Sequence, residues 1–485
     1  MASQTHHPHF LLLPLMSQSH LIPFTQMAKL LATNGVSVTI VLTPLNATRF
    51  NMVIDQAKAL NLKIQFHLLP FPSAEAGLPE GCENMDTLPS LQYNHLFFAA
   101  SNMLKEPLEK WLSELETLPT CIVSDICLPW TTNVASKFNI PRVVFHGISC
   151  FSLLCSHNIS HSEVHENVGT SMSKPFVVPD LPHTIELTKA QLPEAMNQNT
   201  KAWKHAIDQF KAAELSAEGI LVNTFEELES MYVRGYEKVV RKIWCIGPLS
   251  LHDKLILDRF GREDNHNKTS TDETELCLNF LSSKKPCSVV YACFGSLSRI
   301  RASQLKELAL GLEASSHPFI WVIGKNDCCE EIEKWLEEES FEERNRGRGI
   351  IVRGWAPQVE ILSHPSTGGF LSHCGWNSAL EAVSAGVPMI AWPMIAEQFL
   401  NEKLIVEVLK IGVGIGVEAG EVLVKNEDVK KAIEQVMEQG GDGEHRRNRA
   451  REMKEKAHKA VQDGGSSASN CKLFLQDILG MLHNS

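Results

Sequence analysis

A repeated alternation between short apolar runs and segments of helical spacing restricts the fold of this chain more than any other feature. Residues 9–15 are a short apolar run, and residues 21–34 then place apolar side chains at helical intervals before Gly35. Residues 36–43 follow as a run rich in β-branched side chains. Strand, helix and strand in this order form the repeating unit of a parallel sheet. The same order returns within residues 120–146, so the first half is predicted to be a doubly wound α/β domain.

The second half of the chain shows the same alternation. Between the halves, residues 247–272 shift to Pro, Gly and a polar run, which is typical of a linker. We therefore expect an N-terminal domain over residues 1–250, a linker over 251–275 and a second α/β domain over 276–465. The C-terminal segment 466–485 is predicted to pack back on the first domain. The strands and helices expected in the second domain are 288–294, 303–315, 319–323, 349–353, 368–372, 378–385 and 387–392.

Charge and composition exclude several classes of protein. The 485 residues include 45 Lys and Arg against 57 Asp and Glu, and the net charge of -12 would repel a nucleic acid over most of the surface. No apolar stretch is long enough to span a bilayer, and the first apolar run is too short for a signal peptide. The thirteen Cys show neither zinc-site nor disulfide spacing. We expect a monomeric cytoplasmic protein with reduced thiols, no nucleic-acid partner and no transmembrane segment.

His20 and Asp125 each follow a predicted strand of the first domain. Ligands of open α/β sheets bind beyond the carboxyl ends of the strands, so these two side chains are candidates for a site. A carboxylate that fixes the tautomer of an imidazole makes that imidazole a general base. The alternative is structural: His20 is then a loop residue, and Asp125 caps the helix that begins near Pro129.

Residues 368–384 have the features of a phosphate site. A predicted strand is followed by the small-residue turn 374–377 and by a predicted helix that begins at Ser378. Backbone N–H groups at the N-terminus of a helix bind anions, and the helix dipole strengthens this binding. The side chains of His373 and Ser378 add hydrogen-bond donors at the same place. The segment is therefore predicted to bind a phosphate.

Three further features of the second domain are open to both a functional and a structural interpretation. Gly295 and Ser296 form another turn after a predicted strand, which suits an anion. Glu381 either binds a ligand or completes a capping box with Ser378. Trp355 either stacks on a nucleobase or is half-buried core. The sequence contains no Walker, HExxH or GxSxG motif, and no Asp-x-Asp pair that would hold a metal on a sugar diphosphate.

Residues 355–398, WAPQVEILSHPSTGGFLSHCGWNSALEAVSAGVPMIAWPMIAEQ, closely resemble the signature box of plant UDP-dependent glycosyltransferases of secondary metabolism. Further matching segments are PLMSQSHLIP at 14–23, SDICLPW at 124–130 and CFGSLS at 293–298, and two loop segments resemble the family-73 branch. The resemblance implies the GT-B fold, in which two Rossmann-like domains face each other across a cleft and the C-terminal helix returns to the first domain. This agrees with the two α/β domains expected above.

The resemblance also implies a role for each matching residue. His20 is the general base, and Asp125 is its partner. Contacts to uracil and ribose are implied for Trp355, Ala356, Gln358 and Glu381. Contacts to the diphosphate are implied for Ser296, His373, Gly375, Asn377 and Ser378. Contacts to the sugar hydroxyls are implied for Trp376, Glu397 and Gln398.

The chain departs from the family pattern at three positions. Cys287 stands where Gly is common, and Ala379 where Thr or Ser is common. Ser19 replaces the usual Gly before the catalytic His, and its Cβ beside His20 would narrow the approach of the acceptor. The departure at Ser19 is therefore the one that bears on the reaction.

The reaction implied by the resemblance is an inverting transfer in one displacement. His20 removes the proton of an acceptor hydroxyl, and the oxygen attacks the anomeric carbon opposite the departing UDP. The N-terminus of the helix at Ser378 and the side chain of His373 stabilise the charge on UDP, so neither a metal nor a cofactor is expected. Trp376 and Gln398 match the pattern for UDP-glucose, with UDP-galactose and UDP-glucuronate as alternative donors.

The acceptor is expected to be a lipophilic molecule with a hydroxyl group, such as a flavonoid, a triterpenoid or a steroid, or a hormone-type molecule. Its pocket is expected in the loops at 70–88 and 148–196, the second of which contains Phe151, Leu153, Leu154 and Phe176.

Two other classes of protein are compatible with parts of the sequence. A UDP-sugar-binding protein without turnover would share the signature box, but the presence of both His20 and Asp125 argues against it. A nicotinamide oxidoreductase would need a Gly-rich fingerprint that opens a helix after a strand. The glycines of 412–416 instead follow a predicted helix, so they are interpreted as part of a strand.

Overall fold

The structure is a computed structural model. It describes residues 7–193, 196, 201–260, 272–416 and 423–482. No helix within these ranges is both long and apolar enough to cross a bilayer.

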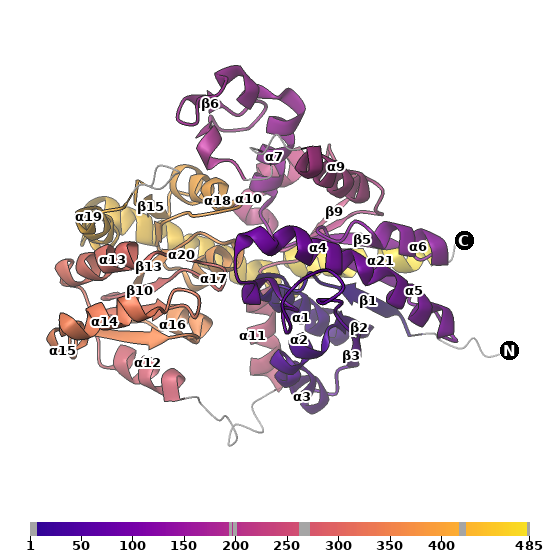
Figure 1. The fold of residues 1–485 in the computed structure, drawn as a ribbon, viewed down its shortest axis with the longest axis horizontal. Coiled ribbons are helices and arrows are strands. Elements are labelled where there is room, and N and C mark those ends of the chain that lie inside the picture. Colours follow the sequence, from indigo (N-terminus) through magenta and orange to yellow (C-terminus); the bar gives the residue numbers. More distant parts are fainter. Residues whose placement is uncertain (1–6, 194–195, 197–200, 261–271, 417–422, 483–485) are drawn as a thin grey trace. The chain divides into compact units, whose positions relative to one another are not determined.

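The chain divides into two compact units, whose elements are labelled in Figure 1. Unit 1 comprises residues 1–148, 200–265 and 459–485, and unit 2 comprises residues 149–199 and 266–458. These bounds differ from the expected domains, because residues 149–199 group with the second unit. Helix α7 (Cys150–Ser162), at the start of this segment, contacts α18 (Gln398–Lys403) of the same unit.

The sheet of unit 1 has, within the described residues, seven parallel strands in the order β3-β2-β1-β4-β5-β8-β9. Strand β1 pairs with β2 on one side and with β4 on the other, so the strand order reverses between β1 and β4. Side chains of β1 and β4 such as Phe10, Leu12 and Val123 are fully buried, as expected of a sheet covered on both faces. The strands are β1 (His9–Leu13), β2 (Ser37–Leu42), β3 (Ile64–Leu68), β4 (Cys121–Asp125), β5 (Arg142–His146), β8 (Ile220–Val222) and β9 (Ile243–Cys245).

The C-terminal helix α21 belongs to unit 1 and packs beside β9 (Figure 1). The ring of Phe474 lies 5.7 Å from that of Phe10 and 5.2 Å from that of Trp244, between centroids. The helices of this unit are α1 (Gln18–Thr33), α2 (Pro44–Arg49), α3 (Asn51–Ala59), α4 (Asn94–Met103), α5 (Lys105–Glu114), α6 (Thr131–Phe138), α9 (Lys201–Leu215), α10 (Glu226–Tyr236), α11 (Leu249–Phe260) and α21 (Ser466–Leu482).

Helix α11 occupies the first part of the segment that the sequence assigned to a linker. Its Leu249 and Leu251 are buried, and Asp253 forms an ion pair of 2.8 Å with the buried Lys29 of α1. These contacts attach α11 to α1. The first part of the expected linker is therefore a packed helix, despite its polar composition. Residues 261–271 of the expected linker lie outside the described residues.

The sheet of unit 2 has six parallel strands in the order β12-β11-β10-β13-β14-β15, counted over the described residues. The strand order reverses between β10 and β13, which pair directly. Gly412 and Gly414 lie in strand β15, as predicted, and Gly416 follows it, so these glycines do not form a dinucleotide fingerprint. The strands are β10 (Val289–Cys293), β11 (Phe319–Ile323), β12 (Gly349–Arg353), β13 (Thr367–Ser372), β14 (Met389–Ala391) and β15 (Gly412–Gly414).

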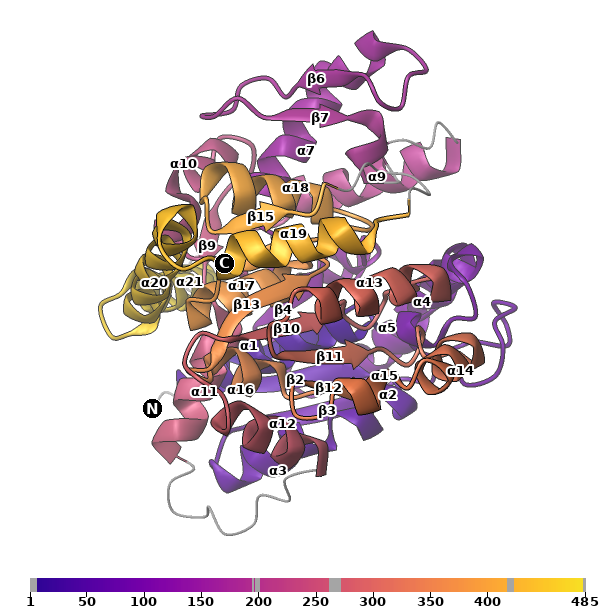
Figure 2. The same cartoon turned by 90° about the vertical axis from the view of Figure 1, so that its left-hand side faces the viewer.

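Helices α13 and α19 of unit 2 lie side by side (Figure 2). They approach closely at Gly311, where a Cβ atom would lie 2.5 Å from the Cβ of Val429. A hairpin of β6 (Pro175–Val177) and β7 (Glu186–Thr188) accompanies α7. Besides α7 and α18, the α-helices described in this unit are α12 (Asp272–Ser282), α13 (Ala302–Ala314), α14 (Glu330–Glu338), α15 (Phe341–Arg344), α16 (Gln358–Ser363), α17 (Trp376–Ala385), α19 (Asn426–Met437) and α20 (Gly441–Val461), which ends in unit 1.

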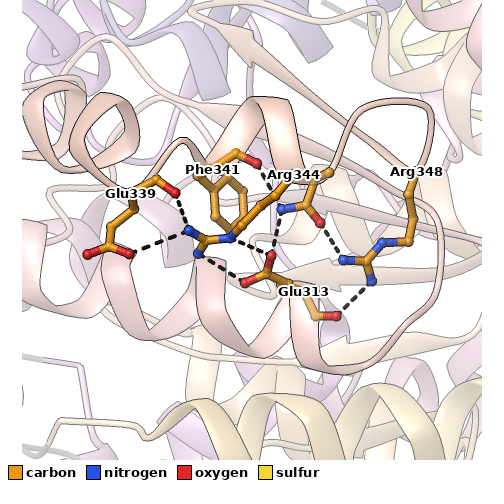
Figure 3. Close-up of polar contacts among 6 residues, drawn as sticks. Glu313, Glu339, Phe341, Arg344 and Arg348 are labelled. Carbon is orange, nitrogen blue, oxygen red and sulfur yellow. Dashed lines mark hydrogen bonds and ion pairs between the residues drawn. The ribbon is translucent and has the colours of Figure 1, made fainter.

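A polar cluster fixes the helices that precede β12 (Figure 3). The guanidinium of Arg344 donates to both carboxylate oxygens of Glu313, at 2.7 and 3.1 Å, and these hydrogen bonds lower the pKa of Glu313. The buried Asn345 donates to Glu313 at 3.0 Å and to the carbonyl of Phe341 at 2.9 Å. Since Asn345 comes shortly before β12, the cluster lies toward the amino ends of the strands.

Candidate active site

His20 and Asp125 contact each other in unit 1. His20 is the third residue of α1, which follows β1, and Asp125 is the last residue of the neighbouring strand β4. The Nδ1 atom of His20 lies 2.7 Å from Oδ2 of Asp125. The Asp125 side chain is 2% exposed, whereas that of His20 is 32% exposed. The pair thus combines a buried carboxylate with an accessible imidazole at the point where the strand order reverses.

Hydrogen bonds keep the Asp125 carboxylate ionised. Burial opposes ionisation, but the charge and hydrogen bond of His20, together with the N–H groups of Cys127 and Leu15, lower the pKa of Asp125 below its ordinary value. The N–H of Cys127 donates to Oδ1 at 3.0 Å. An ionised carboxylate on Nδ1 places the proton of neutral His20 on that nitrogen, so Nε2 is the atom that can take up a proton.

A turn from the region 84–87 holds the start of α1. The N–H of Gln18 donates to Oδ2 of Asp86 at 2.8 Å, and the N–H of Met85 donates to the carbonyl of Met16 at 2.9 Å. Asn84 accepts a hydrogen bond from the N–H of Asp86. This turn, which the sequence assigned to an acceptor-binding loop, therefore also fixes the backbone beside His20.

Unit 2 carries the predicted phosphate site in the connection from β13 to α17. Helix α17 begins at Trp376 with Gly375 as its N-cap, two residues before the predicted start. The capping-box interpretation of Ser378 and Glu381 is therefore wrong, because both residues lie inside the helix. The first turn of α17 instead presents the backbone N–H groups of Trp376, Asn377 and Ser378, which suits an anion.

The imidazole of His373 lies between two glycine turns. A Cβ atom on Gly295 would lie 2.7 Å from Cε1 of His373, and a Cβ atom on Gly375 would also collide with the ring. Only glycine permits this approach at either position. Desolvation lowers the pKa of His373 to about 4, so the ring is neutral at physiological pH. A neutral imidazole offers one N–H donor to a phosphate without a charge of its own.

Two neighbouring polar side chains, Asn326 and the buried Asp327, hold the loop that contains Ser296. The carboxylate of Asp327, which is 3% exposed, accepts from the Ser298 hydroxyl at 2.7 Å and from the N–H of Ile300 at 2.6 Å. The amide of Asn326 donates to the carbonyl of Ser296 at 3.0 Å. Burial raises the pKa of Asp327. The turn after β11 therefore sets the conformation of the turn after β10.

Gln358, Ser378 and Glu381 form one hydrogen-bonded group. The amide nitrogen of Gln358 donates to Oγ of Ser378 at 3.0 Å and to Oε2 of Glu381 at 2.7 Å. The hydroxyl of the buried Tyr291 donates to the amide oxygen of Gln358 at 3.3 Å. Desolvation raises the pKa of Glu381 to about 7, although the hydrogen bond from Gln358 opposes this. Glu381 therefore titrates close to physiological pH.

The remaining predicted residues differ in exposure. Trp355 follows β12 and is 58% exposed, so the half-buried-core interpretation does not apply to it. Ala356 and Trp376 are buried, and Asn377 is half-buried in the first turn of α17. Glu397 is the N-cap of α18. The side-chain amide oxygen (Oε1) of the buried Gln398 accepts hydrogen bonds from the backbone N–H groups of residues 394 and 395, at 2.9 and 3.0 Å.

The predicted residues thus form two groups, one in each unit. His20 and Asp125 share a contact in unit 1, and the other predicted residues follow the carboxyl ends of strands in unit 2. Sequence reasoning missed Tyr291, Asp327 and Asn401, which hold this second group. A signal existed for Asn401 alone: it lies four residues after Glu397 and therefore on the same face of α18.

Comparisons with known proteins cover nearly the whole chain. Residues 9–251 match the family model described as "Glycosyltransferase, N-terminal domain", and residues 221–446 match that described as "UDP-glucoronosyl and UDP-glucosyl transferase". UDP-glycosyltransferase 73C3 from Arabidopsis thaliana is 48% identical over 98% of this chain and 97% of its own length.

Solved structures are similar over the same extent. The crystal structure of UGT73P12 from Glycyrrhiza uralensis, complexed with glycyrrhetinic acid 3-O-monoglucuronide, is 35% identical with a TM-score of 0.87, and covers 99% of this chain and 98% of that chain. Phytolacca americana UGT2, complexed with UDP-2fluoro-glucose and pterostilbene, is 25% identical with a TM-score of 0.77, and covers 97% of this chain and 99% of that chain.

Proposed function

The chain belongs to the family of plant UDP-glycosyltransferases, among relatives of its 73 branch, and we propose that it transfers glucose from UDP-glucose to a hydroxyl group of a lipophilic small molecule. It is a UDP-glycosyltransferase of the GT-B fold, as predicted, with one Rossmann-like sheet in each unit. Sugar transfer from a UDP-sugar to a small-molecule acceptor follows from this membership. The identity of the sugar, the class of acceptor and the general base are our proposals.

The observation that carries the base assignment is the 2.7 Å contact between Nδ1 of His20 and Oδ2 of Asp125. Nε2 of His20 takes the proton from the acceptor hydroxyl, and the ionised Asp125 stabilises the imidazolium that forms. The acceptor oxygen attacks the anomeric carbon while the bond to UDP breaks on the opposite side. One displacement of this kind inverts the configuration and needs no covalent sugar intermediate.

The leaving diphosphate is assigned to the N-terminus of α17. Backbone N–H groups of its first turn and the neutral His373 stabilise the charge that develops on UDP, with Ser296, Asn377 and Ser378 as further donors. These fixed dipoles supply the stabilisation that a metal supplies in other enzymes, so we propose a reaction without metal or cofactor. Trp355, Ala356, Gln358 and Glu381 are assigned to uracil and ribose.

The sugar is assigned to Trp376, Glu397 and Gln398. A carboxylate accepts hydrogen bonds from sugar hydroxyls, and an amide donates to them, which suits the adjacent equatorial hydroxyls of glucose. Because the carbonyl of Gln398 accepts from two backbone N–H groups, its NH₂ group is the part assigned to the sugar. The complex of Phytolacca americana UGT2 with UDP-2fluoro-glucose supports this donor. The glucuronide bound to UGT73P12 makes UDP-glucuronate the first alternative, followed by UDP-galactose.

The acceptor class rests on the bound molecules of similar proteins. Glycyrrhetinic acid 3-O-monoglucuronide and pterostilbene, each bound to one of the two proteins above, both contain a large apolar skeleton and hydroxyl groups, and the first also carries a glucuronate. In this chain Phe151, Leu153, Leu154 and Phe176, which belong to the proposed acceptor-binding segment, are buried. We propose a flavonoid, triterpenoid or steroid acceptor, with a hormone-type molecule as the alternative.

A panel of such acceptors, incubated with radiolabelled UDP-glucose, tests the proposed function. We expect a labelled glucoside, identified by mass, together with stoichiometric release of UDP. A higher kcat/KM with UDP-galactose or UDP-glucuronate on the same acceptor would contradict the assignment of the donor. Binding of UDP-glucose without product from any acceptor would favour the alternative of a UDP-sugar-binding protein without turnover.

A further inference from the structure

Asn401 is a fully buried polar side chain that lies behind the predicted phosphate and sugar residues of unit 2. It is 0% exposed and belongs to α18. Its amide nitrogen donates to the carbonyl oxygen of Cys374 at 2.9 Å and lies 3.4 Å from Oε1 of Glu397. One side chain therefore contacts both the turn that leads into α17 and a residue assigned to the sugar.

The hydrogen bond to the Cys374 carbonyl is made where the backbone has an unfavourable conformation. Cys374 has a φ of +64°, a left-handed conformation that residues other than glycine rarely adopt. Such a conformation persists where surrounding contacts fix it. Gly375, the N-cap of α17, comes directly after Cys374, so the orientation of the peptide between them sets the direction of the Gly375 N–H and the entry of the chain into α17.

Two serines fix the orientation of the Asn401 amide. The hydroxyl of Ser152 donates to Oδ1 of Asn401 at 3.0 Å. The hydroxyl oxygen of Ser149, the N-cap of α7, lies 2.8 Å from that of Ser152 and 3.4 Å from the same Oδ1. All three side chains are buried. Because the serines take the oxygen of the amide, its NH₂ group faces Cys374 and Glu397, which can only accept.

We propose that Asn401 is a positioning residue for donor binding, which sets the Cys374 turn and the Glu397 carboxylate so that the diphosphate and the sugar are held. The inference rests on the proposed function, since it needs the diphosphate at the N-terminus of α17. Asn401 acts through its two neighbours and contacts no atom of the donor. Ser152 contributes by holding the amide in its functional orientation.

The test compares the binding of UDP with that of uridine, which lacks both phosphates. In isothermal titration calorimetry, Asn401→Ala should weaken UDP binding by about tenfold, the effect of losing one hydrogen bond to a buried partner. Uridine binding should change by less than about twofold, because the hydrogen-bonded group of Gln358 and Glu381 does not include Asn401. Ser152→Ala should also lower UDP affinity, by a smaller factor. This variant provides the test if Asn401→Ala folds poorly.

Asn345→Ala is the matched control. Asn345 is also a buried asparagine of unit 2, hydrogen-bonded to Glu313 and Phe341, but it belongs to the cluster near the amino end of β12. This variant should lower the melting temperature and leave the affinities for both ligands unchanged.

Two results overturn the inference alone: unchanged UDP affinity in Asn401→Ala, or an equal loss for UDP and uridine. If the unsubstituted protein bound UDP no more tightly than uridine, the assignment of the diphosphate to α17 would fail, and the inference would fail with it.

Discussion

The sheet of unit 1 reverses its strand order between β1 and β4 and carries His20 and Asp125 at this point. The sheet of unit 2 reverses its order between β10 and β13 and carries Ser296 and His373 at the corresponding point. Both sites follow from the same geometry, because the connections on either side of a reversal leave in opposite directions and open a crevice at the carboxyl ends.

The two sites differ in the charge state that they favour for their ionisable side chains. In unit 1, the charge of His20 and hydrogen bonds lower the pKa of Asp125, so a negative charge is kept next to the imidazole that becomes positive in the proposed reaction. In unit 2, desolvation lowers the pKa of His373 to about 4 and raises that of Glu381 to about 7, so both groups tend toward their neutral forms. In the proposed reaction the ionised Asp125 stabilises the imidazolium, whereas the diphosphate is stabilised by backbone dipoles and neutral donors.

The largest expected effect is that of His20→Ala, which should change turnover without changing UDP binding. His20→Ala should lower kcat by roughly 10²–10⁴-fold, since this is the contribution of a positioned base. UDP affinity should remain within about twofold, because no predicted UDP contact comes from unit 1. Steady-state rates and calorimetric titration of the same preparation measure both. Turnover within a fewfold of the unsubstituted protein would end the assignment of His20.

Asp125→Asn should have the next largest effect, on the order of 10²–10³-fold in kcat. The amide can still accept the N–H of Cys127, so the fold is kept, but it no longer holds the imidazole in the required tautomer or stabilises the imidazolium. Circular dichroism serves as the control for folding. Normal turnover by this variant would mean that Asp125 has only a structural role, in the turn that follows β4.

Gln398→Ala should lower kcat/KM for UDP-glucose by about 5–150-fold, which corresponds to ~1–3 kcal/mol for unpaired buried groups. Part of this loss arises because the side-chain oxygen of Gln398 no longer accepts the hydrogen bonds that fix the backbone at residues 394 and 395. Gln398→Glu separates the two causes, because it keeps the accepting oxygen and removes the NH₂ group. Full activity of the Glu variant with UDP-glucose would contradict a role of that group in sugar binding.

The smallest expected effect is a pH dependence confined to unit 2. In the proposed site, ionised Glu381 accepts hydrogen bonds from the ribose, and its pKa of about 7 means that it is mostly protonated at pH 6 and mostly ionised at pH 8. Uridine affinity should therefore rise by up to about tenfold between these pH values and level off above them. Glu381→Gln should bind uridine equally at both. A rise of the same size in this variant would assign the dependence to another group.

The fold and the outlines of both sites were predictable because they depend on local patterns. Alternating apolar runs predict parallel strands and helices, and in a parallel sheet all carboxyl ends lie at one edge. This places His20, Asp125 and the turn before α17 without knowledge of side-chain packing. The resemblance of residues 355–398 then supplies the ligand.

What could not be predicted depends on contacts between distant buried polar groups. Nothing in the local pattern distinguishes Tyr291 from a core residue of its strand, yet its hydroxyl holds Gln358. The Lys29–Asp253 ion pair, which attaches α11, joins residues more than 200 positions apart. The helix start at Trp376 was missed because Ser378 and Glu381 have the spacing of a capping box, while Glu381 contacts Gln358 instead.

The most direct test of the central claim, that His20 and Asp125 act as one general base, is a double-mutant cycle in single-turnover transfer from UDP-glucose. Residues that act as a unit give non-additive losses. We predict that His20→Ala combined with Asp125→Asn is no slower than His20→Ala alone, within about threefold. Losses that multiply across the two substitutions would mean that the residues act independently, and would contradict the account.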